Sequence, residues 1–143
     1  MTSDVRARTD PSIETARSIV ETGLESGAVV TIFGECTVEY DGRAASTLGP
    51  GDRHVMCKPD GTVLVHTDEG HQPVNWQPPG CTHEVVVEDD TLTLESHRDN
   101  PEEELVVAFA VVEHVAAFDV TDPQELSLSG TEEDLRQRIL DEP

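Results

Sequence analysis

The stretch that decides the fold is "ELVVAFAVVEHVAAFDV", which runs from Glu104 to Val120. From Leu105 to Val112 its residues are apolar and rich in valine, a pattern typical of a buried strand. The stretch therefore predicts one long strand, or two consecutive strands, at the centre of a sheet.

Four shorter stretches predict further strands around this centre. Residues 28–33 are rich in β-branched side chains, and residues 35–40 alternate apolar with polar side chains. Residues 52–67 and 83–97 each contain two β-like runs separated by a turn signal, Pro59-Asp60-Gly61 in the first and a pair of aspartates in the second. Each of these two stretches is therefore predicted to form a hairpin.

A helix is predicted at each end of this β-rich body. Residues 11–27 carry apolar side chains at helical spacing, with Asp10 as the expected cap, Pro11 at the first helical position and Gly27 at the end. Residues 131–140 have a cap signal, early acids and late arginines, and they predict the second helix. About eight strands with one helix at each end predict a mainly β fold, either a β-sandwich or a half-open barrel.

A chain of 143 residues is long enough for one domain with a real core. We expect residues 1–27 to be an N-terminal extension that contains the first helix, with residues 1–9 loose. Residues 28–123 should form the β-rich domain, and residues 124–143 a C-terminal helix that leads to a linker.

The charge of the chain is strongly negative, with 9 basic residues against 30 acidic ones and a formal net charge of −21. Lys58 is the only lysine, and the acids are spread over every segment. This pattern is typical of proteins from halophilic archaea, which work in molar salt, where the Debye length falls to about 3 Å. The charge therefore does not exclude a polyanionic partner.

The cysteines and the hydropathy indicate in which cellular compartment the protein is expected. Cys36, Cys57 and Cys81 are far apart and form no C-x-x-C pair, so neither a disulfide framework nor a zinc ribbon is indicated. The chain also lacks the run of about 18 apolar residues that a membrane span needs. We expect a cytoplasmic protein in a reducing compartment, without membrane contact.

Enzyme signatures are absent from the sequence, which has no G-x-S-x-G, P-loop or dinucleotide motif. Gly49–Asp52 is predicted to be a turn rather than a phosphate cradle. The histidines lack the H-x-H spacing of a metal centre, so no metal ligands are assigned, although a cupin-like, histidine-based metal protein remains an alternative. The six histidines are His54, His66, His71, His83, His97 and His114.

The single tryptophan, Trp76, lies in the proline-rich stretch "PVNWQPPGC" from Pro73 to Cys81. One interpretation is that its ring fills the core. The other is that the prolines hold the ring as a rigid platform beside the amide of Asn75, which suits a flat polar group such as an unstacked base. The residues alone leave both interpretations open.

Three stretches together resemble a known family. "CTVEYDGR" (Cys36–Arg43), "KPDGTVLVH" (Lys58–His66) and "PVNWQPP" (Pro73–Pro79) are similar, in order and spacing, to the N-terminal domain of the NucS/EndoMS mismatch-specific DNA endonucleases. The resemblance implies a β-rich module that forms a homodimer and binds DNA, with the nuclease in a separate domain. No catalytic residues and no cofactor are expected in this chain, because the Mg or Mn ion belongs to the nuclease domain.

The resemblance also assigns site residues. Trp76 would stack on a base flipped out of a mismatch, and Asn75 would contact the edge of that base. Tyr40 and Arg43 would lie on the same DNA-facing surface. Weaker candidates for contacts with the DNA backbone are Lys58, Arg53 and His71.

Some partners are left open, since the DNA is expected to be either a mismatched duplex or a single strand. A sliding clamp would be contacted only through the far C-terminal end of the longer proteins. The rival interpretation within this family is a dimerisation domain that does not touch DNA.

Overall fold

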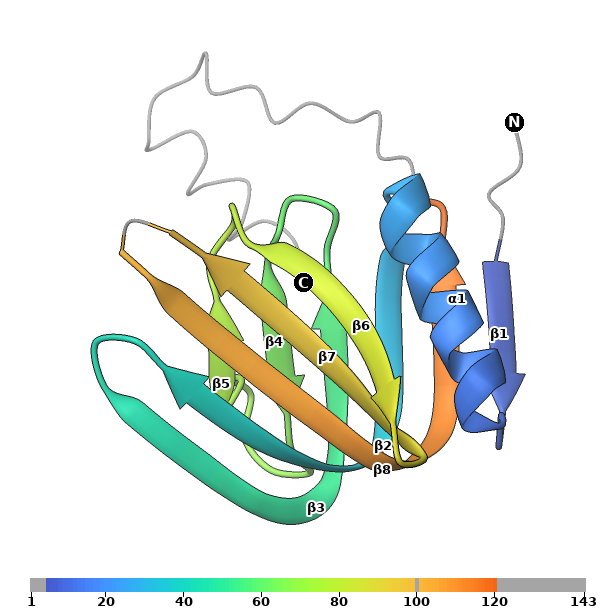
Figure 1. Cartoon of the computed structure of the whole chain (residues 1–143), viewed down its shortest axis with the longest axis horizontal. Coiled ribbons are helices and arrows are strands. Elements are labelled where there is room, and N and C mark those ends of the chain that lie inside the picture. Colours follow the sequence, from blue (N-terminus) through green and yellow to red (C-terminus); the bar gives the residue numbers. More distant parts are fainter. Residues whose placement is uncertain (1–4, 100, 121–143) are drawn as a thin grey trace, which may run out of the picture.

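The protein is described by a computed structural model, which places residues 5–99 and 101–120. These residues form one curved antiparallel sheet of eight strands in the order β5-β4-β3-β2-β8-β7-β6, with β1 paired to β8 and one helix beside it (Figure 1). The elements are β1 (Val5–Thr9), α1 (Ile13–Ser26), β2 (Val29–Asp41), β3 (Ala45–Cys57), β4 (Val63–His66), β5 (Asn75–Gln77), β6 (Thr82–Glu88), β7 (Thr91–Arg98) and β8 (Glu103–Phe118).

The two central strands, β2 and β8, pair from one end to the other. Their inward side chains form the middle of the core, where Val30, Leu105, Val107 and Phe109 are all at most 1% exposed. The prediction of a long central strand is confirmed, and so is the mainly β fold. The three cysteines are unpaired, as expected.

Bulges curve this sheet. The pairing of β2 with β8 shifts register between Phe33 and Gly34, and the pairing of β2 with β3 shifts after Cys36. An extra residue in one strand bends it and increases its twist. Gly34 is needed at the first shift because a Cβ there would overlap the carbonyl of Val111.

The curved sheet nearly closes on itself, which makes the fold a half-open barrel. The buried side chain of Gln77 in β5 donates a hydrogen bond from Nε2 to the carbonyl oxygen of Ser96 in β7, over 2.8 Å. Beside it, the backbone N–H of Gly80 donates to the carbonyl of Asp60, also over 2.8 Å. The first contact ties the β5 edge of the sheet to its β7 side, and the second ties the loop after β5 to the turn between β3 and β4.

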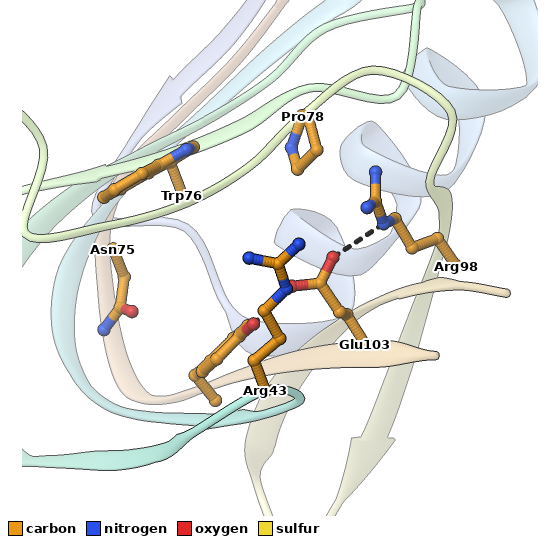
Figure 2. A pocket seen from close by; sticks show the side chains of 7 residues that line it. Arg43, Asn75, Trp76, Pro78, Arg98 and Glu103 are labelled. Atoms are coloured by element: carbon orange, nitrogen blue, oxygen red, sulfur yellow. Dashed lines mark hydrogen bonds and ion pairs between the residues drawn. The ribbon is translucent and has the colours of Figure 1, made fainter. Parts of the chain in front are cut away.

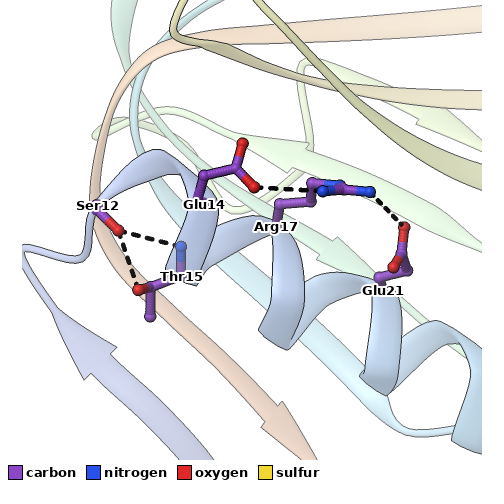
Figure 3. Close-up of polar contacts among 5 residues, drawn as sticks. All are labelled: Ser12, Glu14, Thr15, Arg17 and Glu21. Atoms are coloured by element: carbon purple, nitrogen blue, oxygen red, sulfur yellow. Dashed lines mark hydrogen bonds and ion pairs between the residues drawn. The ribbon is translucent and has the colours of Figure 1, made fainter.

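The helix α1 covers one end of the sheet and ends at Gly27, whose φ of 76° is left-handed and favours glycine. On its exposed side Arg17 pairs with Glu14 and Glu21, at 3.2 and 3.7 Å (Figure 3). Its buried residues are Ala16, Val20 and Gly23.

The start of this helix corrects the sequence prediction. Ser12, not Asp10, is the N-cap, since its hydroxyl accepts a hydrogen bond from the N–H of Thr15 over 3.1 Å. Asp10 has a φ of 51° and donates its backbone N–H to the carbonyl of Glu113 in β8. Pro11 therefore lies before the cap, because the chain must first leave β1.

Two further predictions about loops were wrong. Residues 5–9 are not loose, because they form β1 beside the part of β8 that extends beyond β7 and would otherwise be an open edge. Gly49–Asp52 is part of β3 rather than a turn between strands, and Gly49 and Pro50 form the extra length of a bulge opposite β2. Pro50 suits a bulge because it has no N–H to pair.

The predicted helix at 131–140 lies outside the described residues. None of the helices that the structure describes is long and apolar enough to cross a membrane.

Candidate functional site

One pocket brings together residues from distant parts of the chain. It has a volume of about 350 Å³ and opens where the ends of β2, β7 and β8 face β5 (Figure 2). Seven residues line it, namely Tyr40, Arg43, Asn75, Trp76, Pro78, Arg98 and Glu103.

Trp76 forms one wall of this pocket. It lies on the short edge strand β5, opposite Leu64 of β4, and its side chain is 60% exposed. The next residue, Gln77, is fully buried. Because neighbouring side chains of a strand point to opposite faces, burying the glutamine turns the indole outward. The interpretation of Trp76 as a core residue is therefore wrong.

The opposite wall is a polar network around Glu103, the first residue of β8. The hydroxyl of Tyr40 donates a hydrogen bond to Oε2 of Glu103. The other oxygen, Oε1, lies 2.6 Å from Nε of Arg98, an ion pair whose geometry is not that of an aligned hydrogen bond. The hydrogen bond to the carboxylate is the main reason why the pKa of Tyr40 is raised above its ordinary value.

Arg43 reaches the pocket from the turn between β2 and β3. Its side chain is exposed, and it makes no ion pair with any residue that the structure describes, Asp41 included. Figure 2 shows its guanidinium group turned towards the pocket. The pocket therefore carries a cation on its rim and an amide, Asn75, beside the indole.

The other predicted site residues lie away from this pocket. Arg53 in β3 donates from Nη1 to the carbonyl of Cys36 over 2.6 Å, so its guanidinium is already bound beside the β3 bulge. Lys58 is exposed at the turn between β3 and β4, and His71 is exposed in the loop between β4 and β5. The structure thus groups four of the seven predicted residues and leaves these three outside.

The prediction missed Pro78 as a lining residue, and it also missed the two charged lining residues, Arg98 and Glu103. They are direct partners across the β7–β8 ladder. A signal was present in the sequence, because an arginine and a glutamate flank the short segment between the two predicted strand stretches. Their importance for the site depends on the hydrogen bond between Tyr40 of β2 and Glu103. No local sequence pattern reveals that contact, because the two residues are far apart in the chain.

A second hollow at the same strand ends is rich in acids, and it is lined by Asp41, Gly42, His97, Glu102 and Glu104. The described residues contain a single group of three potential metal ligands, His97, Asp99 and Glu102, whose ligand atoms lie within 4.8 Å of one another. It has one histidine and two exposed carboxylates on the surface. This is not the cluster of inward-facing histidines that a cupin-like protein would need.

The chain was compared with known protein families and relatives. The family model "Endonuclease NucS N-terminal PH-like domain" matches residues 26–125. Endonuclease NucS of Thermococcus kodakarensis is 42% identical over 135 residues, which cover 94% of this chain and 53% of that protein. Endonuclease NucS 2 of Halobacterium salinarum is 41% identical over 116 residues, covering 81% of this chain and 46% of that protein.

Solved structures agree with this relationship. A complex of EndoMS with double-stranded DNA superposes with a TM-score of 0.84 at 41% identity, over 97% of this chain and 58% of that one. EndoMS in its apo form gives a TM-score of 0.79 at 42% identity, over 83% and 55% of the two chains. The chain thus spans about half the length of the relatives it matches. Since the family model covers most of the chain and confirms the resemblance seen in the sequence, the chain belongs to the family of the NucS N-terminal PH-like domain.

Proposed function

We propose that this chain is the DNA-binding module of a mismatch-specific endonuclease and that Trp76 holds a base flipped out of the mismatch. The observation that carries the proposal is the exposed indole in a pocket beside Asn75. The similarity to a protein solved together with double-stranded DNA supports a DNA ligand.

The chemistry of the pocket suits a nucleobase. An indole that is 60% exposed keeps a large apolar face in water, and a stacked base covers it with a gain of about 1 to 3 kcal/mol. The amide of Asn75 both donates and accepts, so it suits the edge of a base. Flipping costs less at a mismatch than at a paired base, so part of the selectivity comes from the DNA itself.

The charges around the pocket set how the DNA backbone is held. Arg43 is proposed to contact a phosphate or a base, since it has no ion-pair partner among the described residues. Lys58 and His71 are exposed and are proposed as weaker backbone contacts, and Arg53 contributes less because it binds a carbonyl. With few cations, binding should depend weakly on salt, because few counterions are released.

The proposal includes a homodimer that forms through the sheet. Phe33 in β2 and Val111 in β8 are 39% and 49% exposed, although both belong to the central strands. These two exposed apolar side chains on the central strands are proposed to contact a second copy. Cleavage and its Mg or Mn ion would belong to a separate nuclease domain, and any sliding-clamp contact to the far C-terminal end of the longer proteins.

The test uses the fluorescence of Trp76, the only tryptophan. The protein is titrated in molar potassium chloride with a duplex that contains a G·T mismatch and with the matched duplex. We expect emission typical of an exposed indole, quenched preferentially by the mismatched duplex. The Val74→Ala variant, which alters a nearby exposed apolar side chain, serves as the control and should respond like the wild type.

Two results would contradict the proposal. Emission unchanged by either duplex, with binding also absent by anisotropy of labelled DNA, would favour a dimerisation domain without DNA contact. Metal bound in stoichiometric amount to histidines would favour the cupin-like alternative.

A further inference from the structure

Glu103 joins three separate segments at the pocket. It begins β8, it lies directly across from Arg98 at the end of β7, and it accepts the hydroxyl of Tyr40 from the end of β2. Each of its two carboxylate oxygens has its own partner, since Tyr40 contacts Oε2 and Arg98 contacts Oε1. All three residues also line the pocket.

The ion pair between Glu103 and Arg98 is largely shielded from water. The side chain of Glu103 is 12% exposed and that of Arg98 is 24% exposed. Shielding a carboxylate from water is costly unless it is paired and hydrogen-bonded, so the contacts of Glu103 with Tyr40 and Arg98 hold these partners in place. The hydroxyl of Tyr40 therefore has one strongly favoured acceptor.

Gly42 leaves the space for this contact. A Cβ at Gly42 would lie 2.5 Å from the hydroxyl oxygen of Tyr40 and 2.9 Å from Cγ of Glu103. The ring is rigid and Glu103 is held by Arg98, so neither neighbour yields without breaking the hydrogen bond. The turn after β2 therefore closes over the pair only because residue 42 has no side chain.

We propose that Glu103 is a positioning residue of the pocket, which fixes the Tyr40 ring opposite Trp76 so that the pocket is already formed before a base enters. This inference rests on the proposed function. A wall fixed in advance favours binding because its side chains lose no further freedom when the base arrives. Glu103 acts through Tyr40 and needs no contact with the base.

The experiment uses the fact that Tyr40 is the only tyrosine of the chain. Tyrosinate absorbance then follows one side chain during an alkaline titration, without any DNA. In the wild type the pKa of Tyr40 is expected above its ordinary value of about 10, because the hydroxyl is bonded to a carboxylate. In Glu103→Gln the acceptor loses its charge, and the pKa should return towards that ordinary value. Gly42→Ala, which leaves the carboxylate in place and displaces the ring, should lower the pKa as well.

The second measurement is the affinity for the mismatched duplex. Glu103→Gln should bind about tenfold more weakly, in line with the loss of one hydrogen bond to a charged group. In the Tyr40→Phe background the same substitution should change affinity less than twofold, since the hydroxyl is already gone. The matched control is Glu39→Gln, which removes the same charge from an exposed position next to Tyr40. It should alter neither the tyrosine titration nor the preference for the mismatch.

The outcomes separate this inference from the proposed function. If Glu103→Gln leaves the pKa of Tyr40 unchanged while circular dichroism shows the native fold, Glu103 does not hold the ring. If the pKa falls but affinity stays at the wild-type value, the ring is held without benefit to binding, and the inference also fails. If the wild type binds no duplex, the proposed function fails, and the titration still decides whether Glu103 positions Tyr40.

Discussion

Gln77 spans the seam of the half-open barrel to reach Ser96, with 2.8 Å between its Nε2 and the Ser96 carbonyl oxygen. The glutamine is fully buried, and its own Oε1 has no hydrogen-bond partner among the described residues. This contact fixes the edge strand that carries Trp76 against the strand that carries Arg98. The two walls of the pocket are thus held through one strand, β7.

We therefore expect Gln77→Ala to lower the free energy of unfolding by about 2 kcal/mol, because it removes a buried hydrogen bond and leaves a cavity. Urea denaturation followed by the fluorescence of Trp76 measures this change. Gln72→Ala, in the exposed loop before β5, is the control and should be close to neutral. Equal stability of the two variants would mean that the seam does not depend on this side chain.

Trp76→Ala should leave the fold intact and remove the preference for mismatched DNA. Because the side chain is 60% exposed, the free energy of unfolding should change by no more than about 0.5 kcal/mol. Loss of stacking should weaken binding of the mismatched duplex by about 1 to 3 kcal/mol, measured by anisotropy. Trp76→Phe should keep part of the affinity, since it retains a smaller ring. Unfolding of the alanine variant would contradict the exposed position of the indole.

Alanine substitutions at two strand glycines should have very different effects on stability. Gly34→Ala drives a Cβ into the carbonyl of Val111 and should cost about 3 kcal/mol of stability, because the bulge must open to relieve the overlap. Gly49→Ala meets nothing within 4 Å and should be close to neutral or slightly stabilising. Thermal unfolding of the two variants side by side provides the comparison. Similar midpoints would show that the bulge is not held by close approach of the backbones.

The stability of the protein should fall as the pH falls below about 6.5, partly because of His83. Burial lowers the pKa of this histidine below its ordinary value of 6.5, and Nδ1 lies 2.7 Å from the hydroxyl of Ser96. The folded state thus favours the neutral ring, so its stabilising contribution is complete above pH 6.5 and is lost as the pH falls through the folded pKa. A hydrogen bond to the backbone of Lys58 and the charge of Asp60 raise the pKa of His83, but by less than burial lowers it.

The pH dependence is measured by urea denaturation between pH 5 and about pH 8. His83→Gln should flatten the curve relative to the wild type. His54→Gln should flatten it to some extent as well, since burial lowers the pKa of His54 too. The exposed His71→Gln is the control. An unchanged slope in His83→Gln would show that another group causes the loss of stability.

Much of the fold could be predicted because local patterns and the core agree. The valine-rich run at Leu105–Val112, the hairpin at Pro59-Asp60-Gly61 and the helix end at Gly27 all lie where the sequence indicated. The errors fall where a distant element decides the local structure. Residues 5–9 form a strand because β8 offers an open edge, and Ser12 replaces Asp10 as the cap because Asp10 is bonded to β8.

The candidate site, like the fold, was predicted from the sequence in part, and the rest depended on the tertiary structure. The sequence determined a mainly β protein of the NucS N-terminal family and singled out Trp76, Asn75, Tyr40 and Arg43, since periodicity and short motifs are local properties of the chain. Only the tertiary structure decided that the indole faces water, that Arg98 and Glu103 complete the pocket, and that Arg53 is bound elsewhere. Those outcomes depend on how the strands register and curl, because contacts between side chains far apart in the chain exist only once the barrel has nearly closed.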